Sequence, residues 1–210
     1  TAKKSEAKRD EFKVDGVPNV DYVLTTQEII QMIKESGIVF EDLEPEAVDM
    51  AYGWMSGAAV IFGVTGGVTE AVLRRVSNNK SNVGLRQIAY TGIRGLNGVK
   101  ETTIPFGDKQ LRIAVVSGLK NTTDLIERIK GGEHFDLVEV MACPDGCING
   151  GGQPYATAEE RSRRSEGLYA ADKLCSIRRS EENPLMMSLY NGVLKGRVHE
   201  LLHVDYTKKK

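Results

Sequence analysis

The sequence predicts an α/β fold, in which a layered sheet with substantial parallel character is flanked by helices. Short apolar segments of strand length alternate with segments of about a dozen residues that carry the helical period, and this alternation is typical of α/β layers. Several of the 22 glycines stand in the turns that join the two kinds of segment. Hydrophobic residues make up 40% of the 210, which is enough to bury a real core.

The charge balance argues against nucleic acid and anionic lipid as partners. The chain carries 28 Lys and Arg against 29 Asp and Glu, so a net charge of −1 provides no field that gathers phosphates. The apolar runs are far shorter than the roughly 20 residues that span a bilayer, so no membrane span is predicted. Three cysteines make a poor disulfide framework, which favours a reducing compartment, most simply the cytoplasm.

No linker or internal repeat divides the chain, so residues 1–210 are predicted to form a single domain. The sequence begins TAKK, with neither an initiator Met nor the apolar segment of a secretory signal. We therefore expect that upstream sequence has been removed or omitted.

The first elements are a charged arm and a strand-to-helix unit. Residues 1–12 are rich in charge and in helix formers, which predicts a solvated helix or arm. Residues 20–24 read as a short buried strand, and Thr25 or Thr26 is expected to cap a helix that ends near Gly37. The apolar face of this helix consists of three isoleucines at helical spacing: Ile29, Ile30 and Ile33.

A second strand-to-helix unit follows. Residues 58–62 predict a buried strand, 63–67 a glycine-rich turn, and 77–82 the end of the next helix. Four apolar side chains are predicted to form the buried face of that helix: Val68, Ala71, Val72 and Val76.

The second half of the chain completes the pattern. Residues 101–106 and 111–116 read as a hairpin around 107–109, and 135–141 as a buried strand. Between them a helix is expected to run to Lys130 and to stop at Gly131-Gly132, with an N-cap from one of three side chains: Asn121, Thr122 or Thr123. From Ala158 onward the chain is predicted to be helical and charged.

A pair of cysteines follows the strand at 135–141, where ligand sites of α/β proteins are found. Cys143 and Cys147 are separated by three residues that include Pro and Gly, and Gly150-Gly151-Gly152 lets backbone amides approach a bulky group. Thiolates are soft ligands, so an iron–sulfur site fits this segment better than zinc. The remaining thiol, Cys175, is predicted to be a buried structural residue.

These residues resemble the iron-iron ([FeFe]) hydrogenases, specifically the C-terminal part of the catalytic domain. The segments MACPDGC at 141–147 and GGGQP at 150–154 look like the third signature of that family. The resemblance covers essentially the whole chain through four further segments: TAKKSEA at 1–7, which is similar to the sequence after the second-signature cysteine, VIFGVTGGVTEA at 60–71, ENP at 182–184 and HELLH at 199–203.

The resemblance implies reversible oxidation of dihydrogen to protons and electrons at an H-cluster, which is a [4Fe-4S] cubane bridged to a diiron unit with CO, CN and azadithiolate ligands. Cys143 would ligate the cubane alone, and Cys147 would ligate it and bridge to the diiron unit. Lys3 would donate hydrogen bonds to a cyanide ligand, because a buried ammonium needs an anionic partner.

The resemblance assigns further roles around the cluster. Phe62 and Met141 would line the apolar pocket of the diiron unit, and Gly63 belongs to the segment that packs on the cluster. The implied partners are ferredoxin, NAD-linked subunits or formate dehydrogenase subunits as electron carriers, together with the upstream part of the same domain. That upstream part would hold the first- and second-signature cysteines, which this sequence lacks.

One residue departs from the family pattern. The position between Pro144 and Gly146 is usually small, whereas Asp145 brings a carboxylate close to the expected cluster. It would either lower the cluster potential or form a local turn hydrogen bond, and the sequence does not choose between them.

Four other functions compete with this interpretation. Hydrogenase-like cytosolic iron–sulfur assembly scaffolds share the cysteine motif without turning over hydrogen, and sensory hydrogenases share the cluster. HELLH also fits a zinc protease pattern, with Asp205 the remaining candidate ligand, although a C-terminal helix with ordinary histidines is favoured. The glycines at 63–67 between a predicted strand and helix suggest a phosphate cradle, but the turn lacks both the G-x-G-x-x-G pattern and the Lys-Ser/Thr of a P-loop, so close packing against a cofactor or a neighbouring strand is the favoured role. His134 has no metal-ligand spacing.

Overall fold

The computed structural model describes residues 2–47, 49, 54–77, 79, 81–106 and 108–203. The chain divides into two compact units, which are described separately. The first comprises Thr1–Ala51, Gly151–Pro154 and Leu185–Lys210, and the second comprises Tyr52–Gly150 and Tyr155–Pro184.

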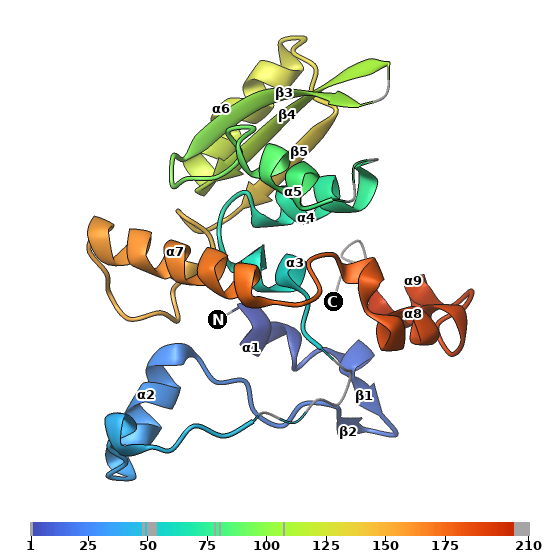
Figure 1. Ribbon diagram of the computed structural model, residues 1–210. Helices are drawn as coiled ribbons and strands as arrows, with labels where there is room; N and C mark the ends of the chain where they lie inside the picture. Colours follow the sequence, from blue (N-terminus) through green and yellow to red (C-terminus); the bar gives the residue numbers. More distant parts are fainter. Residues whose placement is uncertain are drawn as a thin grey trace. The chain divides into compact units, whose positions relative to one another are not determined.

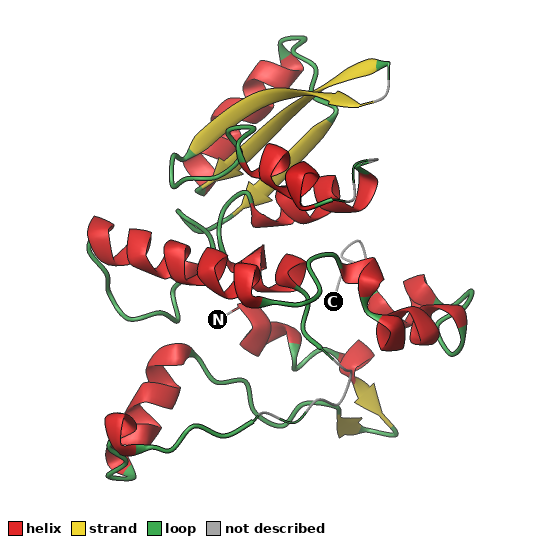
Figure 2. Ribbon diagram, in the orientation of Figure 1, coloured by secondary structure: helices red, strands yellow, loops and turns green. Residues whose placement is uncertain are grey.

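The second unit contains a three-stranded mixed sheet in the order β3-β4-β5 (Figure 2). Strands β3 (Val99–Phe106) and β4 (Lys109–Ser117) form the predicted antiparallel hairpin. Strand β5 (Leu137–Met141) pairs with β4 in parallel, with Ser117 opposite Met141. The predicted α/β class is therefore confirmed, with parallel pairing on one side of the central strand.

Helices cover both faces of this sheet (Figure 1). Alternate residues of a strand point to opposite faces, and β4 uses both. Its residues Ile113 and Val115 pack in a core with Leu73 and Ile88 from helices α4 (Gly67–Val76) and α5 (Asn82–Ala89). On the other face Ala114 and Val116 pack with Leu125 of helix α6 (Leu119–Lys130).

Helix α6 begins earlier than the sequence predicts. It starts after Gly118, which provides no side-chain cap, and the hydroxyls of Thr122 and Thr123 donate instead to the carbonyls of Gly118 and Leu119. The prediction of a cap among residues 121–123 is wrong because these side chains bond back inside the helix. The predicted stop is confirmed, with Gly131 as the C-cap residue.

Residues 58–62 are not a strand. They lie in helix α3 (Gly57–Val60) and the 3₁₀ turn η3 (Ile61–Gly63), where the Ser56 hydroxyl accepts a hydrogen bond from the Ala59 amide. A short apolar run has no periodicity that separates a buried strand from a buried helix, so the N-cap and tertiary packing decide. Gly57 permits this packing because a Cβ there would lie 2.0 Å from the Asp172 carboxylate.

The predicted buried face of α4 is also wrong. Val72 and Val76 are each 39% exposed, whereas Thr69, Glu70 and Arg74 are almost completely buried. Arg74 is paired with Glu70 of its own helix and with Asp172 of helix α7 (Ala158–Leu174). Charged side chains can face the interior because they neutralise one another there.

Helix α7 is the long charged helix predicted after residue 158. Thr157 and Glu160 form a capping box at its start, and Cys175 is its C-cap residue. The short 3₁₀ turn η5 (Ser180–Glu182) follows, where Arg179 donates to the Arg74 carbonyl and to Glu182.

The first unit consists of small elements joined by loops. Its helices and turns are α1 (Ala2–Glu6), η1 (Asp10–Phe12), α2 (Thr26–Glu35), η2 (Phe40–Asp42), α8 (Pro184–Asn191, of which Pro184 belongs to the second unit) and α9 (Val198–Leu202), and its strands are β1 (Lys13–Val14) and β2 (Val17–Pro18). Within the described part of the chain, no helix has both the length and the apolar character needed to cross a membrane.

The predicted N-cap and end of helix α2 are confirmed, whereas the strand predicted just before it, at residues 20–24, is wrong. Thr25 caps α2 through a capping box with Glu28, and Gly37 has a positive φ of 68° just after the helix. Residues 20–24 are not a buried strand, since Val20 and Leu24 are each 45% exposed. A strand needs a neighbour for its backbone groups, and among the described residues this segment pairs with none.

Candidate functional site

The two cysteines of the motif lie in a tight loop that leaves the end of β5. Cys143 follows two residues after the strand, and Cys147 begins the 3₁₀ turn η4 (Cys147–Asn149). The Gly146 amide donates to the Cys143 carbonyl at 3.1 Å, and the Gly150 amide donates to the Cys147 carbonyl at 3.1 Å. Both thiols are free, with Cys143 half-buried and Cys147 exposed.

Glycines allow this loop to pack against the turn after η3. Gly146 has a φ of 90° and a ψ of −156°, which a residue with a side chain adopts only under strain. A Cβ there would lie 2.7 Å from the Met141 sulfur and 3.0 Å from both the Gly63 carbonyl and the Thr65 amide. A Cβ at Gly150 would lie 4.0 Å from the Cys143 sulfur. The cysteine loop therefore adjoins Met141 and Gly63, two of the predicted site residues.

The other two predicted site residues, Phe62 and Lys3, are both substantially exposed and lie in different units. Phe62 precedes Gly63 in η3, and 47% of its surface is exposed. Lys3 lies in the other compact unit, on α1, where its largely exposed ammonium donates to Glu6 at 2.9 Å. Gly63, Met141, Cys143 and Cys147 are thus brought together within one unit.

Two buried charged residues, Lys100 and Glu139, stabilise the turn between η3 and α4, against which the cysteine loop packs. The sequence analysis did not identify either residue. The Lys100 ammonium donates to the Thr65 carbonyl at 3.0 Å and to the Gly95 carbonyl at 2.7 Å. Burial lowers the pKa of Lys100 to about 8, although nearby carboxylates oppose the shift. The Glu139 carboxylate accepts from the amides of Gly66 and Thr69 at 2.6 and 2.7 Å, at the N-terminus of α4.

Glu139 also bears on the phosphate-loop alternative for residues 63–67. Its carboxylate accepts a hydrogen bond from the Gly66 amide, and a bound phosphate would need backbone amides of this kind as donors. A Cβ at Gly67 would lie 1.7 Å from the Ile61 carbonyl, so this glycine serves close backbone packing. Both observations favour the packing role.

Asp145, which lies between the two cysteines in the sequence, makes contacts with three other segments of the chain. Its amide donates to the Ser117 hydroxyl at 3.3 Å, and its carbonyl accepts from the Thr65 amide at 3.1 Å. Its carboxylate forms an ion pair with Arg161 of α7, with 2.6 Å between Oδ2 and Nε. The sequence predicts either a lowered cluster potential or a local turn hydrogen bond for the Asp145 side chain. It does not predict the ion pair with Arg161, because 16 positions separate the two residues.

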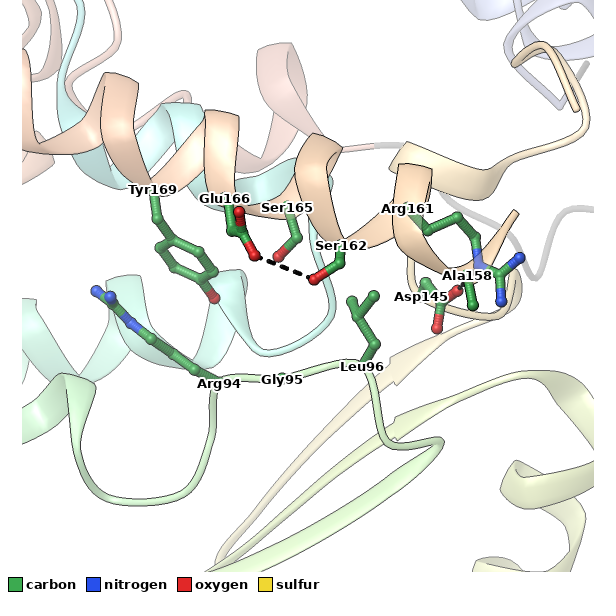
Figure 3. Close-up of a pocket in the computed structure, with 10 residues that line it drawn as sticks. All are labelled: Arg94, Gly95, Leu96, Asp145, Ala158, Arg161, Ser162, Ser165, Glu166 and Tyr169. Atoms are coloured by element: carbon green, nitrogen blue, oxygen red, sulfur yellow. Dashed lines mark hydrogen bonds and ion pairs between the residues drawn. The ribbon is translucent and has the colours of Figure 1, made fainter. Parts of the chain in front are cut away.

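The Asp145–Arg161 pair lies in the wall of a pocket of about 510 Å³ (Figure 3). Arg94 and Tyr169 form another part of the wall, with the guanidinium carbon 4.0 Å from the centre of the tyrosine ring. Ser162 donates to Glu166 at 3.2 Å across one turn of α7. The pocket reaches the cysteine loop through Asp145.

The histidine motif forms no assembled metal centre in the part of the chain that the structure describes. The Nδ1 atoms of His199 and His203 lie 2.7 Å apart, and Glu200 is paired with Arg197. Asp205 lies outside the described residues. Among the described residues, no three or more His, Cys, Asp and Glu side chains are grouped so as to hold a metal ion.

Cys175 is half-buried rather than buried. Its sulfur donates to the Ala171 carbonyl at 3.4 Å, one turn back along α7. This bond to its own helix agrees with a structural thiol.

Replacing Gly146 with alanine is expected to destabilise the protein by about 2–4 kcal/mol, because the added Cβ combines backbone strain with overlap at Met141, Gly63 and Thr65. Gly92→Ala is the matched control, since Gly92 has a similar φ of 88° but nothing within 4 Å of its Cβ position. It should cost only about 1 kcal/mol. Urea unfolding measures both, and equal losses would show that the overlap around Gly146 is relieved without cost.

Comparison with known proteins identifies relatives along the whole chain. Residues 1–151 match the model of the iron only hydrogenase large subunit, C-terminal domain, and residues 158–209 match that of the iron hydrogenase small subunit. The NADP-reducing hydrogenase subunit HndD of Solidesulfovibrio fructosivorans is 43% identical, over 99% of this chain and 37% of that protein. Cytosolic iron-sulfur assembly component 3 of Mus musculus is 32% identical, over 97% of this chain and 45% of that protein.

A solved structure shares the fold. A variant of the [FeFe]-hydrogenase HydA1 from Chlamydomonas reinhardtii superposes with a TM-score of 0.70 and 35% sequence identity, over 98% of this chain and 61% of that chain. The chain thus spans less than half the length of the two curated relatives above.

Proposed function

The chain belongs to the iron-only hydrogenase family, and on this premise we propose that it forms part of a site that interconverts dihydrogen with protons and electrons. The observation that carries the proposal is the glycine-framed loop at the end of β5, which presents two free thiols. Iron–sulfur clusters are held by thiolates, and glycines let the backbone approach their sulfides.

The residues present fit part of an H-cluster site. Cys143 would ligate the cubane, and Cys147 would ligate it and bridge to the diiron unit. A four-iron cube normally takes four thiolates, so we propose that an upstream part of the same domain provides the others and that residues 1–210 belong to that one domain. Gly150 lies beside the Cys143 sulfur, where its backbone amide is close to the proposed ligand.

The remaining site residues would shape the surroundings of the cluster. Lys3 would donate from its ammonium to a cyanide ligand, since charge-assisted hydrogen bonds of this kind are strong. Phe62 and Met141 would exclude water from the diiron side, and Gly63 would let the backbone pack closely on the cluster. When bound, the cluster supplies the redox and hydrogen chemistry, while the protein supplies orientation, dryness and charge compensation.

A scaffold for iron–sulfur cluster assembly is the second candidate. It is favoured by the 32% identity to an assembly component, which spans the same region of the chain. The 43% identity to a hydrogenase subunit supports the enzyme instead. A sensory hydrogenase with the same cluster is a variant of the first proposal.

The electron partners follow from the same proposal. A ferredoxin, an NAD-linked subunit or a formate dehydrogenase subunit would exchange electrons with the cubane. The relative that is named an NADP-reducing hydrogenase subunit supports a nicotinamide-linked partner. A cytoplasmic location belongs to this proposal and is supported by the three free thiols.

Infrared spectroscopy of the matured full-length protein tests the proposal. We expect C–O and C–N stretching bands, because only the diiron unit carries these ligands. The apoprotein, prepared without maturation, is the control and should lack them. A protein that binds an iron–sulfur cluster after complete maturation but shows no such bands would be the assembly scaffold.

A further inference from the structure

Asp145 has an unusual backbone conformation for a residue with a side chain. Its φ is 66°, and among the described residues only Asp15 shares a positive φ without being glycine. Asp15 lies in the exposed turn between β1 and β2, whereas Asp145 is only 7% exposed and stands between two proposed cluster ligands. A left-handed aspartate costs about 1 kcal/mol or more, so surrounding contacts must hold it.

Those contacts come from three separate elements. Ser117 at the end of β4 accepts from the Asp145 amide, and Thr65 after η3 donates to its carbonyl. Arg161 on α7 pairs with its carboxylate, and the same guanidinium donates to the Ala156 carbonyl at 2.9 Å. The guanidinium is thus held by the segment just before α7 as well as by the Asp145 carboxylate.

The charges of this pair lie beside the cysteine loop in a largely buried place. The Asp145 side chain is 11% exposed and that of Arg161 is 28% exposed. Charges in such surroundings are screened less than charges in water. Cluster reduction potentials respond to nearby charge, because a negative group opposes the arrival of an electron and a positive group favours it.

We propose that the Asp145–Arg161 ion pair is a positioning device that fixes the loop between Cys143 and Cys147 and balances the charge beside it, thereby setting the reduction potential of the iron–sulfur cluster. This inference rests on the proposed function. Asp145 provides the negative charge and anchors the loop, and Arg161 cancels that charge from α7. Lys100 is a second cation near Asp145 and remains present in every variant below.

The sign of the effect separates this role from a purely structural one. Asp145→Asn removes a negative charge and leaves Arg161 in place, so the midpoint potential of the cluster should rise. Arg161→Gln leaves the Asp145 charge without this partner, so the potential should fall. In the double variant the two shifts should largely cancel.

Two further variants test the same charges if Asp145→Asn or Arg161→Gln fails to fold. Asp145→Gly removes the same charge and also relieves the backbone strain, so it should raise the potential as Asp145→Asn does. Arg161→Lys keeps the positive charge and should leave the potential near that of the unchanged protein. Iron content, measured alongside, reports whether the loop still holds its cluster.

The measurement is a spectroelectrochemical titration of the full-length protein, reconstituted anaerobically with iron and sulfide. Shifts of opposite sign at positions 145 and 161 support the inference. Unchanged potentials, or shifts of the same sign in both single variants, overturn it. If the unchanged protein binds no iron–sulfur cluster, the proposed function itself fails, which is a different result from an unchanged potential.

Discussion

Replacement of Cys147 with serine is expected to abolish assembly of the iron–sulfur cluster, and Cys143→Ser should do the same. A serine hydroxyl is a much poorer ligand for iron than a thiolate, and each substitution would remove one of only two thiols in the loop. Neither change should disturb the fold strongly, because Cys147 is exposed and Cys143 is half-buried. The expected loss is therefore a loss of binding rather than of structure.

Cys175→Ser provides the matched control. This thiol donates to the Ala171 carbonyl of its own helix, and a serine hydroxyl can make the same bond. Iron and acid-labile sulfide per chain, measured after anaerobic reconstitution, should fall close to zero in the two loop variants and stay unchanged in the control. Wild-type iron content in Cys147→Ser would remove this residue from the proposed site.

Replacement of Asp172 with asparagine is expected to destabilise the protein by about 3–5 kcal/mol, the usual loss when one partner of a buried ion pair is removed. The carboxylate is completely buried and accepts four hydrogen bonds, two from Arg74 at 2.8 Å and two from Arg178 at 2.7 and 2.8 Å. An asparagine would remove one of the negative charges that neutralise the buried Arg74 and would point an amide N–H₂ at a guanidinium.

The pKa of Asp172 agrees with this role. Burial by itself would raise it, but the hydrogen bonds from Arg74 and Arg178 outweigh burial, so the pKa lies below its ordinary value. A carboxyl whose pKa is lowered by folding stabilises the folded state at neutral pH and loses that effect only as the pH falls through the lowered value. The effect of the substitution should therefore be complete at pH 7.

Asp124→Asn is the control for a charge that is not buried. Asp124 pairs with Lys120 on α6 at 3.2 Å, and both side chains are largely exposed, at 62% and 89%. Such pairs contribute about 0.5 kcal/mol or less. Urea unfolding followed by circular dichroism compares the variants, and a midpoint for Asp172→Asn equal to that of the control would contradict the structural role of the buried cluster.

Local signals in the sequence were sufficient for several elements. The start of α2 was predictable from Thr25 and Glu28, and the end of α6 from the glycines at 131–132. Helix caps and stops depend on hydrogen bonds and backbone conformation within about four residues, so the local sequence is enough to predict them. The hairpin of β3 and β4 and the strand β5 were predicted from alternation and apolar content. The cysteine loop was recognisable because its chemistry is contiguous in the chain.

Other features depended on partners that are distant in the sequence. Residues 58–62 are helical and η3 and α3 pack against α7, whereas residues 20–24 form no strand and have no strand neighbour among the described residues. The inward face of α4 was mispredicted because hydrophobicity alone cannot foresee that Asp172, 98 positions away, makes Arg74 a buried residue. The same limitation hid the contact between Asp145 and Arg161.

By itself the sequence determined the family, the class of fold and the two thiols that predict an iron–sulfur site, since these are properties of contiguous residues. Tertiary structure decided which charges are buried, which face of α4 turns inward, and how the cysteine loop rests on Thr65, Ser117 and Arg161. The physical reason is that burying a charge is favourable only when a partner meets it, and only the folded chain brings such partners together.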